Sequence, residues 1–439
     1  MKKLSLLEII SIAVGSMIGA SIFSIFGFGA QVAGSDLPLA FLLSGFYAMI
    51  VAYSYSILGS QIISNAGPIG FILKGMGDTP ITGALSILFW LCYVVSIALL
   101  SKGFTGYFLP LVGLELSYLN SSVVEFSLIL FFVVLNFFGS KAVGRSELFI
   151  VITKVSILLL FIIAGFWTIK GENIQPRFDA QHSTGLISAS VILFLSYMGF
   201  GLITNASENI ENPKKNVPKA IWLSILIVMI IYILVSLVTL GNLSLEEVTA
   251  AKENALAIAS KPFLGEFGFL LVSIGALLST ASALNAGIFG GANVAYSLAK
   301  DGELPRFFER KVWFRSMEGL YITAGLGFLF ALLFDLGSIA TITSSVITAV
   351  YIFVIVSHIK LRKEYGGNLI ILLVNLIILV AVFIALLRFQ WQDHRAAFYG
   401  TMMTFSGALI TEYFFRWIRN RTLKQRNEIK FKSQSKPYK

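Results

Sequence analysis

The sequence has little charge, cysteine or histidine. Only 13% of its 439 residues are charged, whereas a soluble domain carries about 25%. The single cysteine, Cys92, excludes an internal disulfide and a cysteine metal cluster. His182, His358 and His394 are far apart and lack metal-ligand spacing. We therefore expect no metal and no cofactor, and the sequence offers no nucleophile–base constellation of a membrane enzyme.

Long apolar runs dominate the chain instead. Hydrophobic residues make up 56% of it, and the mean hydropathy is +0.84. A helix needs about 20 apolar residues to cross a bilayer, and no ten-residue alternating strand pattern recurs. The first run is too long for a signal peptide and lacks a cleavage pattern. Twelve predicted membrane helices begin near Glu8, Leu39, Ile81, Ser122, Leu148, Gly185, Ile221, Phe263, Gly319, Gly337, Leu369 and Ala397.

The positive charges are distributed unevenly between the predicted loops. The net charge is +10, yet most Lys and Arg residues fall in the loops and ends on one side. The other side carries six: Lys170, Arg177, Lys252, Lys261, Arg388 and Arg395. This asymmetry follows the positive-inside rule and predicts a multi-pass cell-membrane protein with both termini in the cytoplasm. The basic tail, residues 421–439, is expected beside anionic lipid rather than nucleic acid.

Two predicted helices carry a glycine-marked break near their middles. The breaks lie at Gly15–Gly19 in the first span and at Ser196–Phe200 in the sixth. Spans that are five apart run in opposite directions, so the pair predicts an inverted five-plus-five repeat with discontinuous helices one and six. The alternative is that these glycines mark only close helix packing. The repeats would cover about 8–170 and 184–360, with extra helices at 369–416, in one membrane domain over 1–420.

The two breaks suit the head group of an α-amino acid. N–H groups at Ala20, Ser21 and Ile22 start a new half-helix and favour a carboxylate. Carbonyls of Phe194, Leu195 and Ser196 at the other break favour an ammonium. Side-chain contacts would come from Met17, Tyr197, Met198 and Phe200, although plain helix packing also accounts for these side chains. The predicted substrate-binding residues are Met17, Gly19, Ala20, Ser21, Phe194, Leu195, Ser196, Tyr197 and Gly199.

Three stretches resemble the amino acid–polyamine–organocation (APC) transporters, most closely the archaeal and bacterial proton-coupled members. They are the glycine-rich stretch from Gly15 to Phe23, the loop from Glu208 to Ala220 with its Asn-Pro and Val-Pro steps, and Ala299–Pro305. The resemblance implies an all-α fold of leucine-transporter type with two extra C-terminal helices, and alternating access. The chain departs from the family at Gly19-Ala20-Ser21, where Gly-Ser-Gly is common.

Lys154 is a charge inside the apolar run from Leu148 to Trp167. A charge at the bilayer centre costs about 2.5–3.5 kcal/mol on insertion scales, so it needs a partner or a task. In sodium-driven relatives of this fold, a cation binds at the first break and at hydroxyls of helix eight. The resemblance therefore implies a proton-coupling site in which the Lys154 amine replaces sodium, since the charge of lysine is sensitive to burial. The matching positions are Gly15, Ile18, Ser279, Thr280 and Ser282.

Other interpretations stay open at this point. The long Lys154 stem could instead extend to the cytoplasmic interface, and Lys102, near the outer end of span three, is expected to extend outward. The predicted function is proton-coupled, sodium-independent uptake of small neutral or varied amino acids, with amino acid or amine exchange as the alternative. A channel would require rings of charge or carbonyls along a pore, and few charges lie within the spans. The sequence leaves the oligomeric state open.

Overall fold

A computed structural model describes residues 3–63, 67–137, 143–171, 180–300, 304, 306–310 and 318–419. This part of the chain is helical and contains no strand, apart from one isolated bridge between Leu4 and Ile210. Its α-helices are α1 (Leu6–Met17), α2 (Ala20–Ser24), α3 (Phe26–Ala33), α4 (Leu37–Gln61), α5 (Gly67–Met76), α6 (Pro80–Leu111), α7 (Tyr118–Phe137), α8 (Val143–Phe166), α9 (Ala180–Leu193), α10 (Leu202–Asn205), α11 (Pro213–Asn242), α12 (Leu245–Ala251), α13 (Ala255–Ala259), α14 (Lys261–Lys300), α15 (Glu318–Leu333), α16 (Leu336–Tyr365), α17 (Leu369–Asp393) and α18 (Arg395–Arg419). Short 3-10 segments are η1 (Gly34–Asp36), η3 (Phe194–Gly201), η4 (Ser207–Asn209), η5 (Lys252–Asn254) and η6 (Arg306–Glu309).

Ten helical segments of the described residues are long and apolar enough to cross a membrane, which confirms an all-helical, multi-pass membrane protein. The ten do not include α15, which is apolar but shorter, or α18. The count of twelve spans therefore stays a prediction. The ten segments are Leu6–Ser24, Phe26–Gln61, Pro80–Leu111, Tyr118–Asn136, Phe149–Phe166, Ser183–Asn205, Pro213–Asn242, Lys261–Lys300, Leu336–Tyr365 and Leu369–Asp393.

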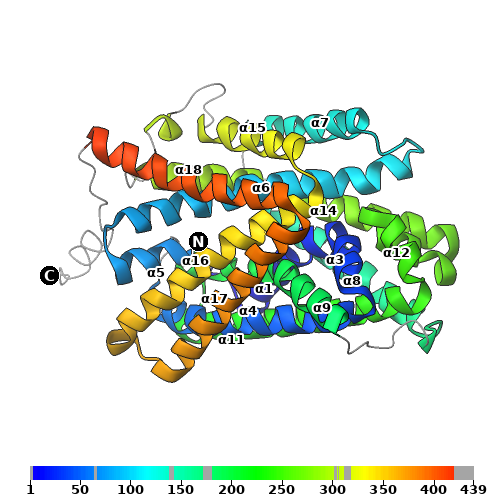
Figure 1. The fold of residues 1–439 in the computed structure, drawn as a ribbon, viewed down its shortest axis with the longest axis horizontal. Helices are drawn as coiled ribbons and strands as arrows, with labels where there is room; N and C mark the ends of the chain where they lie inside the picture. Colours follow the sequence, from blue (N-terminus) through cyan, green and yellow to red (C-terminus); the bar gives the residue numbers. More distant parts are fainter. Residues whose placement is uncertain are drawn as a thin grey trace.

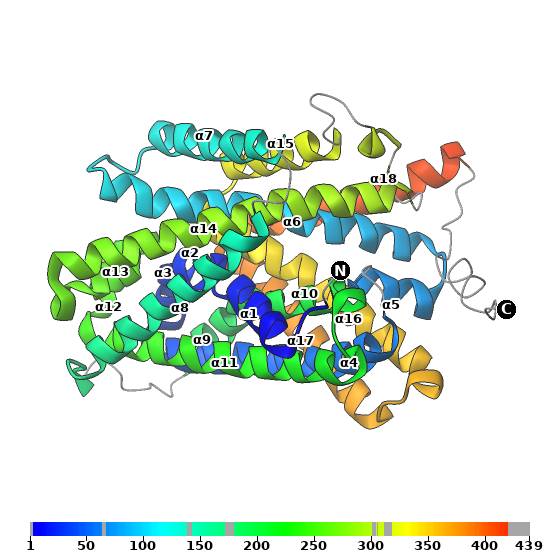
Figure 2. The ribbon, with the colours of Figure 1, turned by 180° about the vertical axis from the view of Figure 1, so that it is seen from behind.

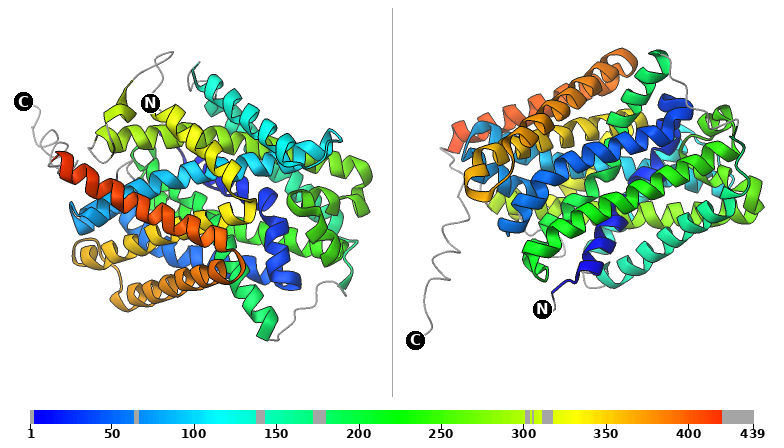
Figure 3. Two further views of the ribbon diagram at one scale, coloured as in Figure 1. Left: turned by 45° about the horizontal axis from the view of Figure 1, so that its top comes forward. Right: turned by 90° about the horizontal axis from the view of Figure 1, so that it is seen from below.

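The bundle is layered around two deeply buried helices, α6 and α16. At the opposite extreme, α7 and α17 expose large apolar side chains such as Phe131 and Ile377, as expected for surfaces that face lipid. α7 and α15 lie side by side along one edge (Figure 1). α17 and α18, orange and red, lie at the periphery of the bundle (Figure 3).

The first helix is fixed at its start by local sequence. Ser5 and Glu8 form a capping box, in which the Ser5 N–H donates to the Glu8 carboxylate at 2.8 Å. Just before it, Leu4 exchanges backbone hydrogen bonds with the end of η4 and the residues that follow: Leu4 N donates to Asn209 O, and Glu211 N donates to Leu4 O. The N-terminus is thus attached to the loop that follows the sixth predicted span. α5 and the last turns of α18 lie toward one end of the molecule, and α12 and α13 lie at the other (Figure 2).

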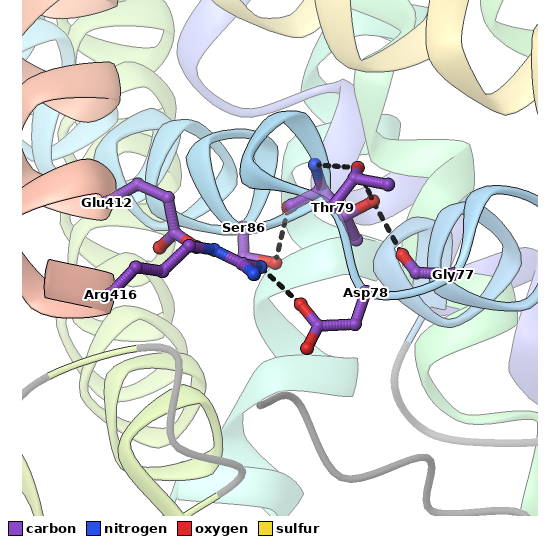
Figure 4. Close-up of polar contacts among 7 residues, drawn as sticks. Gly77, Asp78, Thr79, Ser86, Glu412 and Arg416 are labelled. Atoms are coloured by element: carbon purple, nitrogen blue, oxygen red, sulfur yellow. Dashed lines mark hydrogen bonds and ion pairs between the residues drawn. The ribbon is translucent and has the colours of Figure 1, made fainter. Parts of the chain in front are cut away.

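The last helix is joined to the start of α6 by an ion-pair cluster (Figure 4). Arg416 of α18 pairs with Asp78, two residues before α6, and its Nε donates to Glu412 Oε1 at 2.7 Å. The Glu412 side chain is completely buried. Gly83 makes room for it, because a Cβ there would lie 2.1 Å from Glu412 Oε1. One cation therefore pairs with two carboxylates where α18 meets the core.

Candidate functional site

The candidate site forms where α1 ends, because the last carbonyls of a helix have no partner within it. α1 stops at Met17, and Ile18 leaves the helical region with φ −78° and ψ 58°. The Ile18 N–H still donates to Val14 O, at 2.8 Å. α2 then begins at Ala20. The stretch between them leaves carbonyl oxygens that neighbouring helices must satisfy.

Lys154 supplies the first of these donors. Its amine donates to Gly15 O at 2.5 Å, and the residue is only 1% exposed. One turn earlier on α8, Val151 packs directly on Gly15, where a Cβ would meet its Cγ2 at 2.3 Å. Gly15 therefore permits the close approach of α1 and α8 that brings the amine to the carbonyl. The interpretation of Lys154 as a side chain extended to the interface is wrong.

Two hydroxyls supply the next donors. The Tyr232 hydroxyl, from α11, donates to Met17 O at 2.5 Å, and Ser279 Oγ, from α14, donates to Ile18 O at 3.0 Å. Together with Lys154, these groups bring three different helices to the end of α1. Helix contacts of α1 with both α8 and α11 agree with this arrangement (Figure 2).

The second break region, η3, packs against the end of α1. A Cβ at Gly199 would lie 2.8 Å from the backbone nitrogen of Met17, so only glycine allows this approach. The predicted substrate residues of η3, namely Phe194, Leu195, Ser196, Tyr197 and Gly199, are all buried. Among the described residues, the Ser196 hydroxyl has no hydrogen-bond partner. The two sequence stretches singled out by their glycines therefore meet in space.

Other predicted residues lie nearby with different contacts. Tyr197 directs its hydroxyl to Phe41 O of α4, at 2.9 Å. Thr280 donates to Ala276 O within α14, rather than to α1. Ser282 is also buried on α14. Gly19 faces α14 as well, since a Cβ at this position would lie 3.3 Å from the Ala283 side chain. Ala20 and Ser21 start α2, and their side chains lie outside what the structure describes.

Tyr232 and the partner of Lys102 were not identified from the sequence. Tyr232 is a lone hydroxyl in an apolar span, and such a residue gives no periodic or motif signal. Lys102 does not simply extend outward, because its amine pairs with Glu125 of α7 at 3.4 Å, and Glu125 is only 2% exposed. The third motif, Ala299–Pro305, lies mostly outside the described residues.

Comparisons with known proteins extend this description to the family. An uncharacterized protein of Methanocaldococcus jannaschii is 58% identical over 429 residues, covering 98% of this chain and 99% of the relative. The inner membrane transport protein YbaT of Escherichia coli is 33% identical over 405 residues, 90% of this chain and 92% of its own. The branched-chain amino acid permease BcaP of Lactococcus lactis is 26% identical over 390 residues, 82% of each chain.

The expected resemblance to APC transporters is confirmed. The two relatives above whose names state a function are a transport protein and a permease, not enzymes. A family model for amino acid permeases matches residues 4–411, nearly the whole described helical bundle. Because that match covers far more than half of the sequence, the chain belongs to the amino acid permease family of the APC superfamily.

Proposed function

We propose that this chain is a secondary active transporter that moves amino acids across the cell membrane by proton-coupled, sodium-independent alternating access. The buried contact between Lys154 and Gly15 carries the proposal. It joins a titratable amine to the main chain of α1, next to the segment where α1 and η3 meet. A proton can thereby act on the same helix that would hold the substrate.

The proposed fold has twelve spans, with helices one and six discontinuous. α15 and α18 would be the two spans beyond the ten long apolar segments. Residues of about 8–170 and 184–360 would form inverted repeats, with extra helices at 369–416 and a cytoplasmic tail at 421–439. The charge asymmetry of the loops supports cytoplasmic termini.

The proposed substrate site lies between the end of α1 and η3. N–H groups at Ala20 and Ser21 would hold the substrate carboxylate, since the first N–H groups of a helix lack partners within it. Carbonyls of η3, including that of Ser196, would hold the ammonium. The buried Ser196 hydroxyl, without a partner among the described residues, supports a ligand at this place, because buried polar atoms normally find one. The other predicted residues of α1 and η3, Met17, Gly19, Phe194, Leu195, Tyr197 and Gly199, would form its walls.

The proposed coupling follows from the strength of one hydrogen bond. A charged ammonium binds a carbonyl about twice as strongly as a neutral donor does. Protonated Lys154 would therefore hold α1 against α8, while Ser279 joins the adjoining Ile18 carbonyl to α14. Loss of the proton would weaken the first of these attachments and release α1. The cycle would thus link protonation to the position of the substrate-binding helix.

Transport in liposomes tests the proposal. Purified protein is reconstituted in sodium-free vesicles, and uptake of each of the twenty labelled amino acids is measured with and without an inward proton gradient. We expect small neutral amino acids to accumulate only with the gradient, and a protonophore to abolish the accumulation. A requirement for sodium would reject proton coupling. Uptake that depends only on amino acid inside the vesicles would identify an exchanger.

A further inference from the structure

The start of α1 is attached to the loop before α11 by two backbone hydrogen bonds. Leu4 N donates to Asn209 O at 2.8 Å, and Glu211 N donates to Leu4 O at 3.0 Å. These bonds place Leu4 beside Ile210 in a parallel bridge. Ile210 is fully buried, and the Leu4 side chain packs against the same hydrophobic core. α1 therefore has an attachment at the opposite end from the carbonyl that Lys154 contacts.

The loop that receives Leu4 is held in place by its own sequence. Asn212 has left-handed backbone angles, φ 43° and ψ 60°, a region in which asparagine is common. Its carbonyl accepts hydrogen bonds from Lys215 N at 2.9 Å and Asn216 N at 3.0 Å in the first turn of α11. The Asn216 side chain donates to Glu211 O at 2.6 Å. The residue that binds Leu4 through its N–H is thus fixed through its carbonyl, which gives this asparagine-rich motif a structural task.

The bridge is weak enough to open and close in a transport cycle. The net contribution of one backbone hydrogen bond is small, and its loss changes an equilibrium about fivefold. The charged bond between Lys154 and Gly15 O is about twice as strong as a neutral one. The attachments at the two ends of α1 are therefore of similar size, and loss of the proton from Lys154 leaves the start of the helix held.

We propose that the bridge between Leu4 and Ile210 is a latch that must open before α1 can move away and release the substrate. The inference rests on the proposed transport, in which α1 moves when Lys154 loses its proton. The amine controls one end of α1, and the latch controls the other. Because both contacts have to break, deprotonation alone does not open the site, and leakage of substrate stays low.

A cross-link tests whether the bridge opens. Paired residues of neighbouring strands lie about 4.8 Å apart, within the Cα separation of about 4.4–6.8 Å that a disulfide spans. Oxidation of the double variant Leu4→Cys and Ile210→Cys should nearly abolish alanine uptake in liposomes, and reduction should restore it. Each single variant under the same oxidant is the control, since the native Cys92 is buried. Equal uptake before and after complete cross-linking, verified by mass spectrometry, would overturn the inference.

Two further variants weaken the latch from opposite sides and need no cross-link. Leu4→Pro removes the N–H that binds Asn209 O, and Asn216→Asp removes the amide donor to Glu211 O. Each should raise alanine efflux from loaded vesicles without a proton gradient about fivefold. Leu4→Ala keeps the backbone bonds and is the matched control, with efflux close to that of the wild type.

The outcomes separate the latch from the proposed function. Wild-type efflux in both Leu4→Pro and Asn216→Asp would overturn the latch, whatever the cysteine pair does to folding. An equal rise of efflux in Leu4→Ala would overturn it too, because the side chain and not the backbone bridge would then be responsible. A wild type that takes up no amino acid would instead reject the proposed function.

Discussion

Replacement of Lys154 by methionine should abolish proton-driven uptake while it changes stability little. The substitution removes a charged donor from Gly15 O, and a hydrogen bond to a charged group is worth about 1.5–3 kcal/mol. It also removes the cost of a charge within the membrane, about 2.5–3.5 kcal/mol. Methionine keeps most of the apolar stem. The two effects oppose each other, so the free energy of unfolding should change by less than about 2 kcal/mol.

The assay separates folding from coupling. Thermal denaturation in detergent reports stability, and alanine uptake into sodium-free liposomes is measured over a series of inward proton gradients. Lys154→Met, which never carries the charge, and Lys154→Arg, which carries it permanently, should both lose the dependence of uptake on the gradient. Each variant fixes one protonation state, whereas the proposed cycle needs both.

The second lysine within the spans provides the control. Lys102→Met removes the partner of the buried Glu125 carboxylate, and an uncompensated buried charge costs about 3–5 kcal/mol. This variant should therefore lose stability but keep gradient-driven uptake in the protein that folds. Gradient-dependent transport at the wild-type rate in Lys154→Met would refute the coupling role.

Three further predictions follow from close contacts. Gly199→Ala should cost about 1–3 kcal/mol and impair uptake, because the added Cβ would lie 2.8 Å from a backbone nitrogen of α1; denaturation and uptake measure both effects. Arg416→Ala should destabilise the protein by about 3 kcal/mol, since it removes the cation that pairs with the buried Glu412 carboxylate; denaturation at neutral pH measures this. Ser244→Ala should increase amide exchange in α12 by removing a helix cap worth about 1 kcal/mol. The Ser244 backbone N–H and hydroxyl hold the pKa of the Glu247 carboxyl below its ordinary value of 4.5, so the cap stabilises the helix above that pH and is lost as the pH falls through the lowered pKa.

Each of these variants has a control. Gly407→Ala lies on an exposed part of α18, where a Cβ would meet nothing within 4 Å, and it should be neutral. Lys261→Ala breaks an exposed pair with Glu266, which should cost less than about 1 kcal/mol. Glu247→Gln should mimic acid at neutral pH. Wild-type stability in Arg416→Ala, or equal exchange of α12 with and without the cap, would contradict the assigned contacts.

Much of the architecture was predictable because each membrane helix appears in the sequence as one long run of apolar residues. Apolar runs fixed the all-helical class, and a charge in such a run marked Lys154 as unusual. The glycine stretch at Gly15–Gly19 coincides with the end of α1 at Met17, and Gly15 is needed for close packing because a Cβ there would lie 2.3 Å from Val151 Cγ2. Composition and short motifs carry this information directly, without knowledge of which helices are neighbours.

The partners of these residues depend on packing between distant segments and were harder to predict. Lys102 pairs with Glu125 because α6 and α7 are adjacent, and no spacing rule connects residues on separate helices. Tyr232 is 215 residues from the carbonyl that it contacts. A hydroxyl in an apolar span is common and costs little to bury when it finds an acceptor, so the sequence gives no reason to select this one.

The three donors at the end of α1 differ in their response to pH, which leads to a last prediction. Lysine gains and loses a proton when its surroundings change, whereas the serine hydroxyl of Ser279 stays neutral. Ser279→Ala removes a 3.0 Å bond to Ile18 O and should weaken the attachment of α1 to α14 by about 1 kcal/mol. The rate of uptake should therefore change by the same factor at every pH. The size of the proton gradient that gives half-maximal uptake should stay the same. Lys154 variants should instead remove that dependence. If Ser279→Ala shifts the midpoint as strongly as the lysine variants do, proton coupling belongs to the whole group of donors and not to the amine.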